Sequence, residues 1–237
     1  MNNEKRGLSI IKKLLIILTV LFLGAVAFFL ALFPRESRLA KQLPLAISSL
    51  NQKDNVQSVK LNNINPFIQE AAIASQDEHF YNNWGVDFAG TIRAIAMTIS
   101  TGQRQGASTI TEQLGKNAYF KDRDNLVTDI DTKLLAPFIT LNFPKETILE
   151  MYLNSIYFGK NAYGIYNASK TYFNTTPDKV TLAQAAFMIG LIDAPSYFAA
   201  DKKAAIVQAQ IVLGEMARDK FISVSQEDEA EKMLQKF

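Results

Sequence analysis

An uncharged apolar run at residues 14–33, LLIILTVLFLGAVAFFLALF, limits what this chain can fold into more than any other feature. As a helix rising about 1.5 Å per residue, it would match the roughly 30 Å hydrocarbon core of a bilayer. A buried core helix would carry polar residues at helical spacing, and a cleaved signal peptide would have a shorter apolar region and a small-residue cleavage site. Of these three alternatives, the sequence favours an uncleaved transmembrane helix.

The charges on either side of the run predict its orientation. The preceding residues Glu4, Lys5, Arg6, Lys12 and Lys13 sum to +3, which favours a cytoplasmic N-terminus, although Arg35, Arg38 and Lys41 follow the run. We therefore expect a single-pass protein of the cell membrane. Its segments would be a cytoplasmic tail (1–13), a membrane span (14–33), a stem (34–57) and an extracytoplasmic domain (58–237).

Charge and residue usage exclude several kinds of site. The whole chain carries +2, so removing the +3 of the tail leaves the remainder near −1, which does not favour nucleic-acid binding. The chain has no cysteine, which excludes disulfides and thiolate metal sites. The single histidine, His79, excludes a metal centre built from several histidines.

The pattern beyond residue 65 predicts a mainly α domain. Apolar residues recur at helical spacing from Pro66 onward, and Asp87 and either Ser108 or Thr109 stand where helix N-caps are expected. Further helices are expected over 126–142, interrupted or bent at Pro137, and over 144–154 and 201–220. The segment 181–191 is apolar nearly all round and predicts a central buried helix.

Five segments carry fixed patterns of polar and small residues. They read QDEHFYNNWG at 76–85, GASTITEQ at 106–113, TDIDT at 128–132, YLNSIYFG at 152–159, and LAQAA at 182–186 with APSY at 194–197. Their order and spacing resemble the five motifs of the peptidoglycan glycosyltransferases, glycosyltransferase family 51, over roughly 58–198. The second segment is the most specific, because it combines small, hydroxyl and amide residues in a long order.

This resemblance implies a lysozyme-like fold and the polymerisation of lipid II, the lipid-linked precursor of peptidoglycan. A carboxylate must take the proton of the attacking hydroxyl, and cations must stabilise the departing diphosphate. The two catalytic glutamates of the family fall at Gln76 and Thr132, and its basic pair falls at Thr128 and Asp129. An amide has no useful basicity at neutral pH, so Gln76 cannot be the base.

Other family positions keep polar side chains. Asp77 matches the family and is expected to accept orienting hydrogen bonds rather than to act as the base. The fourth-motif aromatics predict core packing more than substrate contact. The resemblance assigns substrate contacts to Asn83, which replaces a histidine, and to Arg93, Ser108, Thr109, Thr111, Gln113, Lys116 and Asn117.

Two residues could supply a displaced base. Histidine is suited to act as a base near neutral pH, but His79 stands at a position that the motif leaves free and is more simply a surface histidine. Glu112 replaces a family glutamine and is more simply a helix-capping residue of a capping box with Ser108 or Thr109. A divalent cation could bridge the diphosphate, although no cluster of metal ligands is visible in the sequence.

Three functional hypotheses follow. The first is a degenerate, membrane-anchored member that binds lipid II or glycan strands with little or no polymerase activity. The second is an active glycosyltransferase with a rearranged site, and the third is an unrelated helical interaction module. The expected partners are lipid II or a glycan strand, the membrane and other proteins of cell-wall synthesis, and not nucleic acid.

Overall fold

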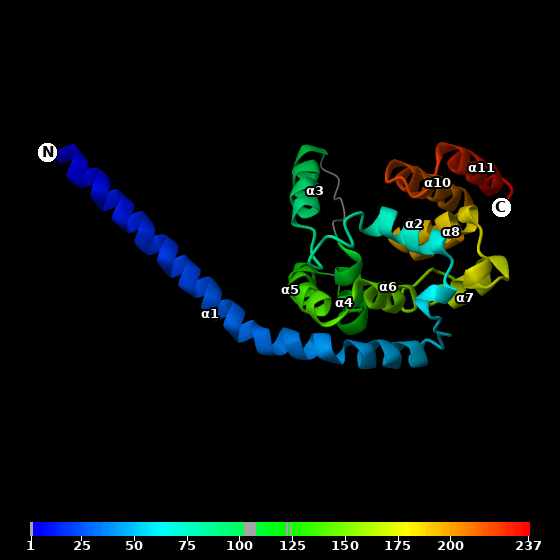
Figure 1. Cartoon of the computed structure of the whole chain (residues 1–237), viewed down its shortest axis with the longest axis horizontal. Helices are drawn as coiled ribbons and strands as arrows, with labels where there is room; N and C mark the ends of the chain where they lie inside the picture. The colour runs from blue at the N-terminus through cyan, green and yellow to red at the C-terminus, as the bar shows by residue number, and fades with distance from the viewer. Residues whose placement is uncertain (1, 102–107, 122, 124) are drawn as a thin grey trace. The chain divides into compact units, whose positions relative to one another are not determined.

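The structure of the chain is a computed structural model that describes residues 2–101, 108–121, 123 and 125–237 (Figure 1). Within these ranges the regular structure is helical, and the β pairing is limited to one isolated bridge between Tyr157 and Tyr163. The prediction of a mainly α fold is therefore confirmed.

The chain forms two compact units, Met1–Leu39 and Ala40–Phe237. Helix α1 (Asn2–Lys53) begins in the first unit, where most of the described apolar side chains are exposed, among them Leu15, Phe22 and Leu23. Among the described residues, no helix is long and apolar enough to cross a membrane. The predicted span over 14–33 is therefore not confirmed.

In the part of the second unit that the structure describes, the end of α1 is followed by ten further α-helices. These are α2 (Pro66–Gln76), α3 (Phe88–Thr101), α4 (Ile110–Tyr119), α5 (Leu126–Asn142), α6 (Lys145–Leu153), α7 (Ile165–Phe173), α8 (Leu182–Gly190), α9 (Pro195–Ala200), α10 (Lys202–Arg218) and α11 (Val224–Leu234). The sequence analysis did not predict α7, α9 or α11.

Helix α8 is the centre of one layer of this unit, as its apolar sequence predicts. It packs against α2, α10 and α11, and all its residues except Gln184 are buried. Thr181 and Gln184 form a capping box at its start. Gly190 lets α10 approach closely, because a Cβ there would lie 3.1 Å from Gln208 Cγ and 3.3 Å from the Ala209 nitrogen.

A second layer is formed by α4, α5 and α6, with α4 packed against both of the others. Gly115 of α4 faces α5, since a Cβ there would lie 3.4 Å from Leu135 Cδ2. Helix α5 runs past Pro137 without a break, so the expected interruption is wrong, whereas the alternative of a bend at this residue stays a prediction. Most residues of the first motif lie in the polar segment 77–87, which follows α2. The described residues of the second motif lie at the start of α4.

Candidate functional site

Asp77 ties the first motif to the second. Its Oδ1 accepts a hydrogen bond from Asn83 Nδ2 at 2.7 Å, and its Oδ2 accepts one from the Ile110 backbone at 3.2 Å, at the N-terminus of α4. Burial raises the pKa of Asp77, and the bonds from Asn83 and Ile110 partly offset this effect. With both oxygens engaged, Asp77 has the geometry of an orienting acceptor.

Gly85 completes the turn between these motifs. Its φ is +91°, and a Cβ there would lie 2.5 Å from the Ala136 carbonyl oxygen, so only glycine fits without strain. Its own carbonyl accepts a 2.6 Å hydrogen bond from Thr109 Oγ1. Thr109 also caps α4 by accepting from the Glu112 backbone at 3.1 Å, as predicted.

Gln76 lies in a chain of neutral donors and acceptors. Gln113 Nε2 donates to Gln76 Oε1 at 3.1 Å, and the Tyr152 hydroxyl donates to Gln113 Oε1 at 2.9 Å. Burial raises the pKa of Tyr152 well above its ordinary value, so it stays a neutral donor. The position of the first family glutamate therefore holds an amide that already has partners on both of its polar atoms.

Asp193 contacts Gln76 in the folded chain, although the sequence pattern did not indicate this residue. Gln76 Nε2 donates to Asp193 Oδ1 at 3.0 Å, and Gln208 Nε2 of α10 donates to Asp193 Oδ2 at 2.7 Å. Desolvation raises the pKa of Asp193, while these two hydrogen bonds lower it. Because Asp193 is 117 positions from Gln76, no local pattern could indicate the contact.

Glu112 forms a buried ion pair with Lys133 of α5. Its Oε2 accepts from Lys133 Nζ at 2.8 Å, and only 2% of its side chain is exposed. Burial raises the pKa of Glu112 to about 7, against the opposing effect of Lys133. Within the described part of the chain, its Oε1 is buried without a hydrogen-bond partner. The side chain thus pairs with Lys133 and does not complete a capping box, contrary to the simpler sequence interpretation.

The two threonines of the third motif are buried in α5. Thr132 is 4% exposed, and its hydroxyl donates to the Asp129 carbonyl at 3.0 Å. Thr128 is 2% exposed and its hydroxyl donates to Asn125 Oδ1 at 3.3 Å. Neither threonine can supply the charge that the family places at its position.

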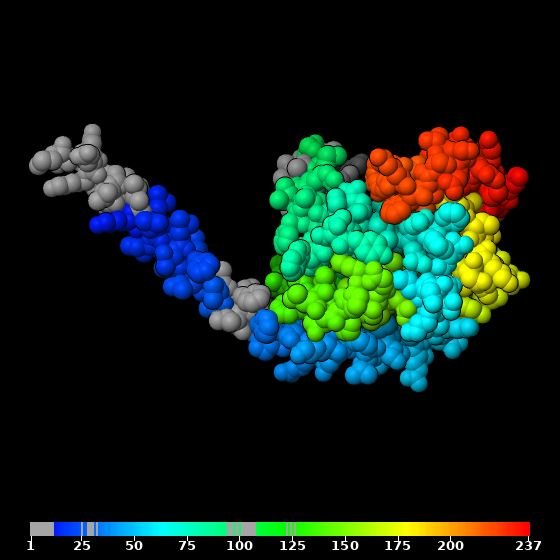
Figure 2. Space-filling view, in the orientation of Figure 1, coloured from blue at the N-terminus to red at the C-terminus, as the bar shows by residue number. Residues whose placement is uncertain are grey.

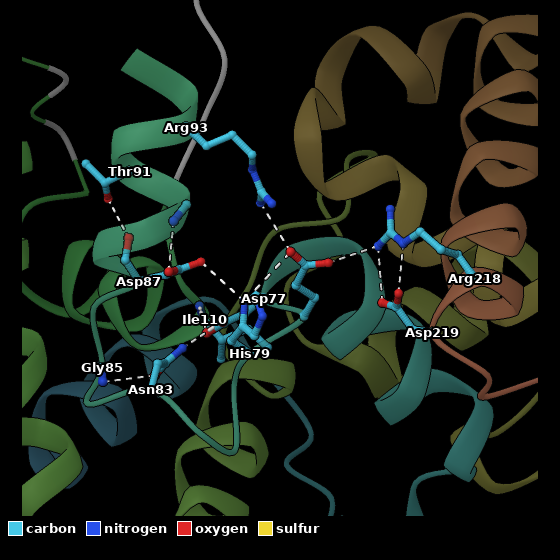
Figure 3. Close-up of polar contacts among 12 residues, drawn as sticks. Asp77, His79, Asn83, Gly85, Asp87, Thr91, Arg93, Ile110, Arg218 and Asp219 are labelled. Carbon is cyan, nitrogen blue, oxygen red and sulfur yellow. Dashed lines mark hydrogen bonds and ion pairs between the residues drawn. The ribbon is translucent and has the colours of Figure 1, made fainter. Parts of the chain in front are cut away.

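His79 and Arg93 belong to an ionic cluster around Glu78 (Figure 3). Arg93 of α3 and Arg218 of α10 each approach one oxygen of Glu78 to 3.2 Å. His79 Nδ1 lies 3.5 Å from Asp87 Oδ2, and about half of the imidazole side chain is exposed. This location agrees with the simpler interpretation of His79 as a surface residue.

The remaining predicted contact residues differ in exposure. Ser108 is exposed, Thr109 and Thr111 are buried, and Gln113, Lys116 and Asn117 are half-buried on α4. Gly106 and Ala107 of the second motif, with Gly102, lie outside the described residues. Among the described residues, no three histidine, aspartate or glutamate side chains are grouped to hold a metal ion.

Comparison with known proteins gives a family match over most of the second unit. The family model described as Transglycosylase matches residues 44–217. Penicillin-binding protein 1A of Neisseria lactamica is 35% identical over 199 residues, which cover 80% of this chain and 25% of that protein. Penicillin-binding protein 1A of Rickettsia bellii is 32% identical over 238 residues, covering 92% of this chain and 30% of that protein.

Solved structures are also similar to this chain. The crystal structure of penicillin-binding protein 1A from Haemophilus influenzae aligns with a TM-score of 0.44 and 22% identity, over 75% of this chain and 17% of that chain. The chain spans about a quarter of the length of the curated relatives it matches.

Proposed function

The chain belongs to the transglycosylase family, the peptidoglycan glycosyltransferases of family 51, and from this premise we propose that it is a non-polymerising member that binds lipid II or a glycan strand. Its role would be to hold substrate or other proteins at the site of cell-wall synthesis. The match of residues 44–217 supports the family part of this proposal.

The hydrogen bonding of Gln76 is the single observation that carries the loss of polymerisation. The reaction needs a carboxylate to take the acceptor proton, an effect of about 10²–10⁴-fold. Gln76 instead donates to Asp193 and accepts from Gln113, so its amide is fixed in a neutral network. At the second glutamate position, Thr132 is buried with its hydroxyl turned back to its own helix.

Fewer positively charged side chains are also available to stabilise a departing diphosphate. Thr128 and Asp129 stand in place of the basic pair, and Lys133 is paired with Glu112 at 2.8 Å. Arg93 is paired with Glu78 at 3.2 Å. Charge developing on a leaving diphosphate would therefore meet fewer preorganised donors, which supports binding without turnover.

We also propose that residues 14–33 anchor the protein in the cell membrane, with tail 1–13 in the cytoplasm, stem 34–57, and domain 58–237 outside. The uncharged sequence of this segment and the exposure of its described leucines support this arrangement. Anchoring would place the domain beside a lipid-linked substrate. A protease-protection experiment in sealed, right-side-out vesicles tests this orientation. Protease added outside the vesicles should digest the domain only if the domain lies on the extracytoplasmic side.

An active, rearranged site is the second proposal, and Glu112 is the observation that favours it. A carboxyl with a pKa of about 7 is suited to proton transfer at neutral pH, and one of its oxygens has no hydrogen-bond partner within the described chain. Only 2% of Glu112 is exposed, however, so substrate would have to open the pair with Lys133 to reach it.

The deciding experiment incubates the detergent-solubilised full-length protein with purified lipid II and measures glycan products and binding together. Binding without product is the expected result. Product above that of a protein-free sample would overturn the proposal in favour of the rearranged site, and Glu112→Gln would then abolish it, whereas His79→Ala would not. Absence of both product and binding would contradict both proposals.

A further inference from the structure

A pocket of about 330 Å³ lies in the second unit, apart from the residues described above. It is bounded by α7, α8, α9, the start of α10 and the C-terminal residue. Figure 2 shows α7, in yellow, at the same end of this unit as the C-terminal segment, in red. The volume of the pocket falls within the range of about 300–1,000 Å³ that is typical of ligand sites.

The walls of the pocket are aromatic. Phe187 of α8 has its ring centroid 5.9 Å from that of Tyr172, 5.6 Å from that of Phe173 and 5.7 Å from that of Phe237. These three pairs meet edge to face, with interplanar angles of 62°, 76° and 72°. Such an arrangement presents ring faces and edges to which a further aromatic ring can add in the preferred geometry.

The wall is held in place by polar contacts outside the pocket. The Tyr172 hydroxyl donates to the Phe158 carbonyl at 2.8 Å. Gly159 has a φ of +85°, and a Cβ there would lie 2.7 Å from Ala199 Cβ, so this turn packs directly against α9. The hydrogen bond positions Tyr172, and the close packing at Gly159 positions α9, on two sides of the pocket.

Two exposed lysines line the pocket. Lys160 Nζ lies 5.0 Å from the centroid of the Tyr172 ring, and Lys202 stands at the N-terminus of α10. Lys160 is also in the left-handed region, with a φ of +47°, in a turn that keeps its side chain beside Tyr172. Aromatic walls beside two cations are complementary to an aromatic group next to carboxylates.

We propose that this pocket binds an acidic peptide segment of a partner protein, which inserts one aromatic side chain between Phe173, Phe187 and Phe198. The carboxylates of the segment pair with Lys160 and Lys202. A peptide anchored by one buried aromatic residue and flanked by charge is a common form of recognition. The interaction does not use Gln76 or its neighbours, so it is separable from the proposed function.

The test uses the full chain in phosphatidylcholine nanodiscs and an acetylated, amidated peptide with one 5-fluorotryptophan flanked by four aspartates. Binding is followed by ¹⁹F NMR as a concentration-dependent shift and broadening. The double variant Lys160→Glu/Lys202→Glu should weaken binding by about tenfold, because two exposed ion pairs become repulsions. A competitor with serine in place of tryptophan should be weaker by about thirtyfold, as expected for loss of an anchor.

A matched control is Lys170→Glu/Lys179→Glu, which changes the same charge at exposed residues that do not line the pocket. It should bind the peptide as the unmodified protein does. A peptide with lysines in place of aspartates should bind the Lys160→Glu/Lys202→Glu variant better than it binds the unmodified protein. This binding would also show that the variant is folded. Equal weakening by both double variants, or equal competition by the serine peptide, would overturn the proposal.

Discussion

Gln76 Nε2 donates a hydrogen bond to Asp193 Oδ1 at 3.0 Å, which joins the end of α2 to the end of the 3₁₀ helix η3 (Leu191–Asp193). The contact joins the position of the first family glutamate to a carboxylate that the motif pattern does not indicate. It is compatible with an amide at residue 76, which donates to Asp193, and incompatible with two ionised carboxylates. The effect of restoring a glutamate at this position therefore depends on Asp193.

Gln76→Glu alone should lower stability at pH 8 relative to pH 5. Two carboxyl groups about 3 Å apart cannot both ionise without repulsion, so the pair should share a proton and titrate with a raised pKa. Melting temperatures at the two pH values measure the effect. The control is Gln76→Glu/Asp193→Asn, which should recover most of the loss at pH 8, and failure to recover it would mean that the Asp193 carboxylate is not the cause.

Polymerase activity should appear only when both acids are restored and Asp193 is neutral. The variant Gln76→Glu/Thr132→Glu/Asp193→Asn should form glycan products from lipid II, although a glutamate at the buried Thr132 should destabilise the domain by about 1–3 kcal/mol. Product chains on a gel are the measurement. An inactive variant that still folds and binds lipid II would assign the defect to the missing basic pair at Thr128 and Asp129.

Glu112→Gln should make stability less dependent on pH. The pKa of Glu112 is 4.5 when unfolded and about 7 when folded, so the folded state binds the extra proton. The contribution of Glu112 to the free energy of unfolding is then highest below about pH 4.5. It falls by roughly 3 kcal/mol as the pH rises to about 7, and it stays lower above that pH. The variant should match the unmodified protein at pH 4 and melt at a higher temperature at pH 8. A higher melting temperature of equal size at both pH values would contradict this explanation.

Tyr152→Phe should destabilise the protein by about 1–2 kcal/mol, because Gln113 Oε1 loses its donor in a buried environment. Unfolding by urea should show a lower midpoint and an unchanged slope. Tyr197→Phe is the matched control, since Tyr197 is 59% exposed, and its effect should stay within about 0.5 kcal/mol. Equal midpoints for the two variants would argue against the proposed amide chain.

The sequence predicted the helices whose boundaries are encoded locally. Thr109 and Asp87 begin helices as expected, because a capping side chain acts within three residues of itself. The apolar segment 181–191 forms the buried helix α8 because its side chains are apolar nearly all round, with only Thr181 and Gln184 not buried. Helix α5 passes Pro137 because packing against α4 outweighs the local preference against proline.

The candidate site likewise has some properties that follow from the sequence and others that depend on the packed domain. Its chemistry was determined by the sequence alone, because Gln76 and Thr132 carry no carboxylate in any fold. Only the tertiary structure decided that Asp193 contacts Gln76 and that Glu112 pairs with Lys133 away from water. These contacts join residues far apart in the chain, and the pKa of Glu112 depends on burial, which is a property of the packed domain and not of the residue.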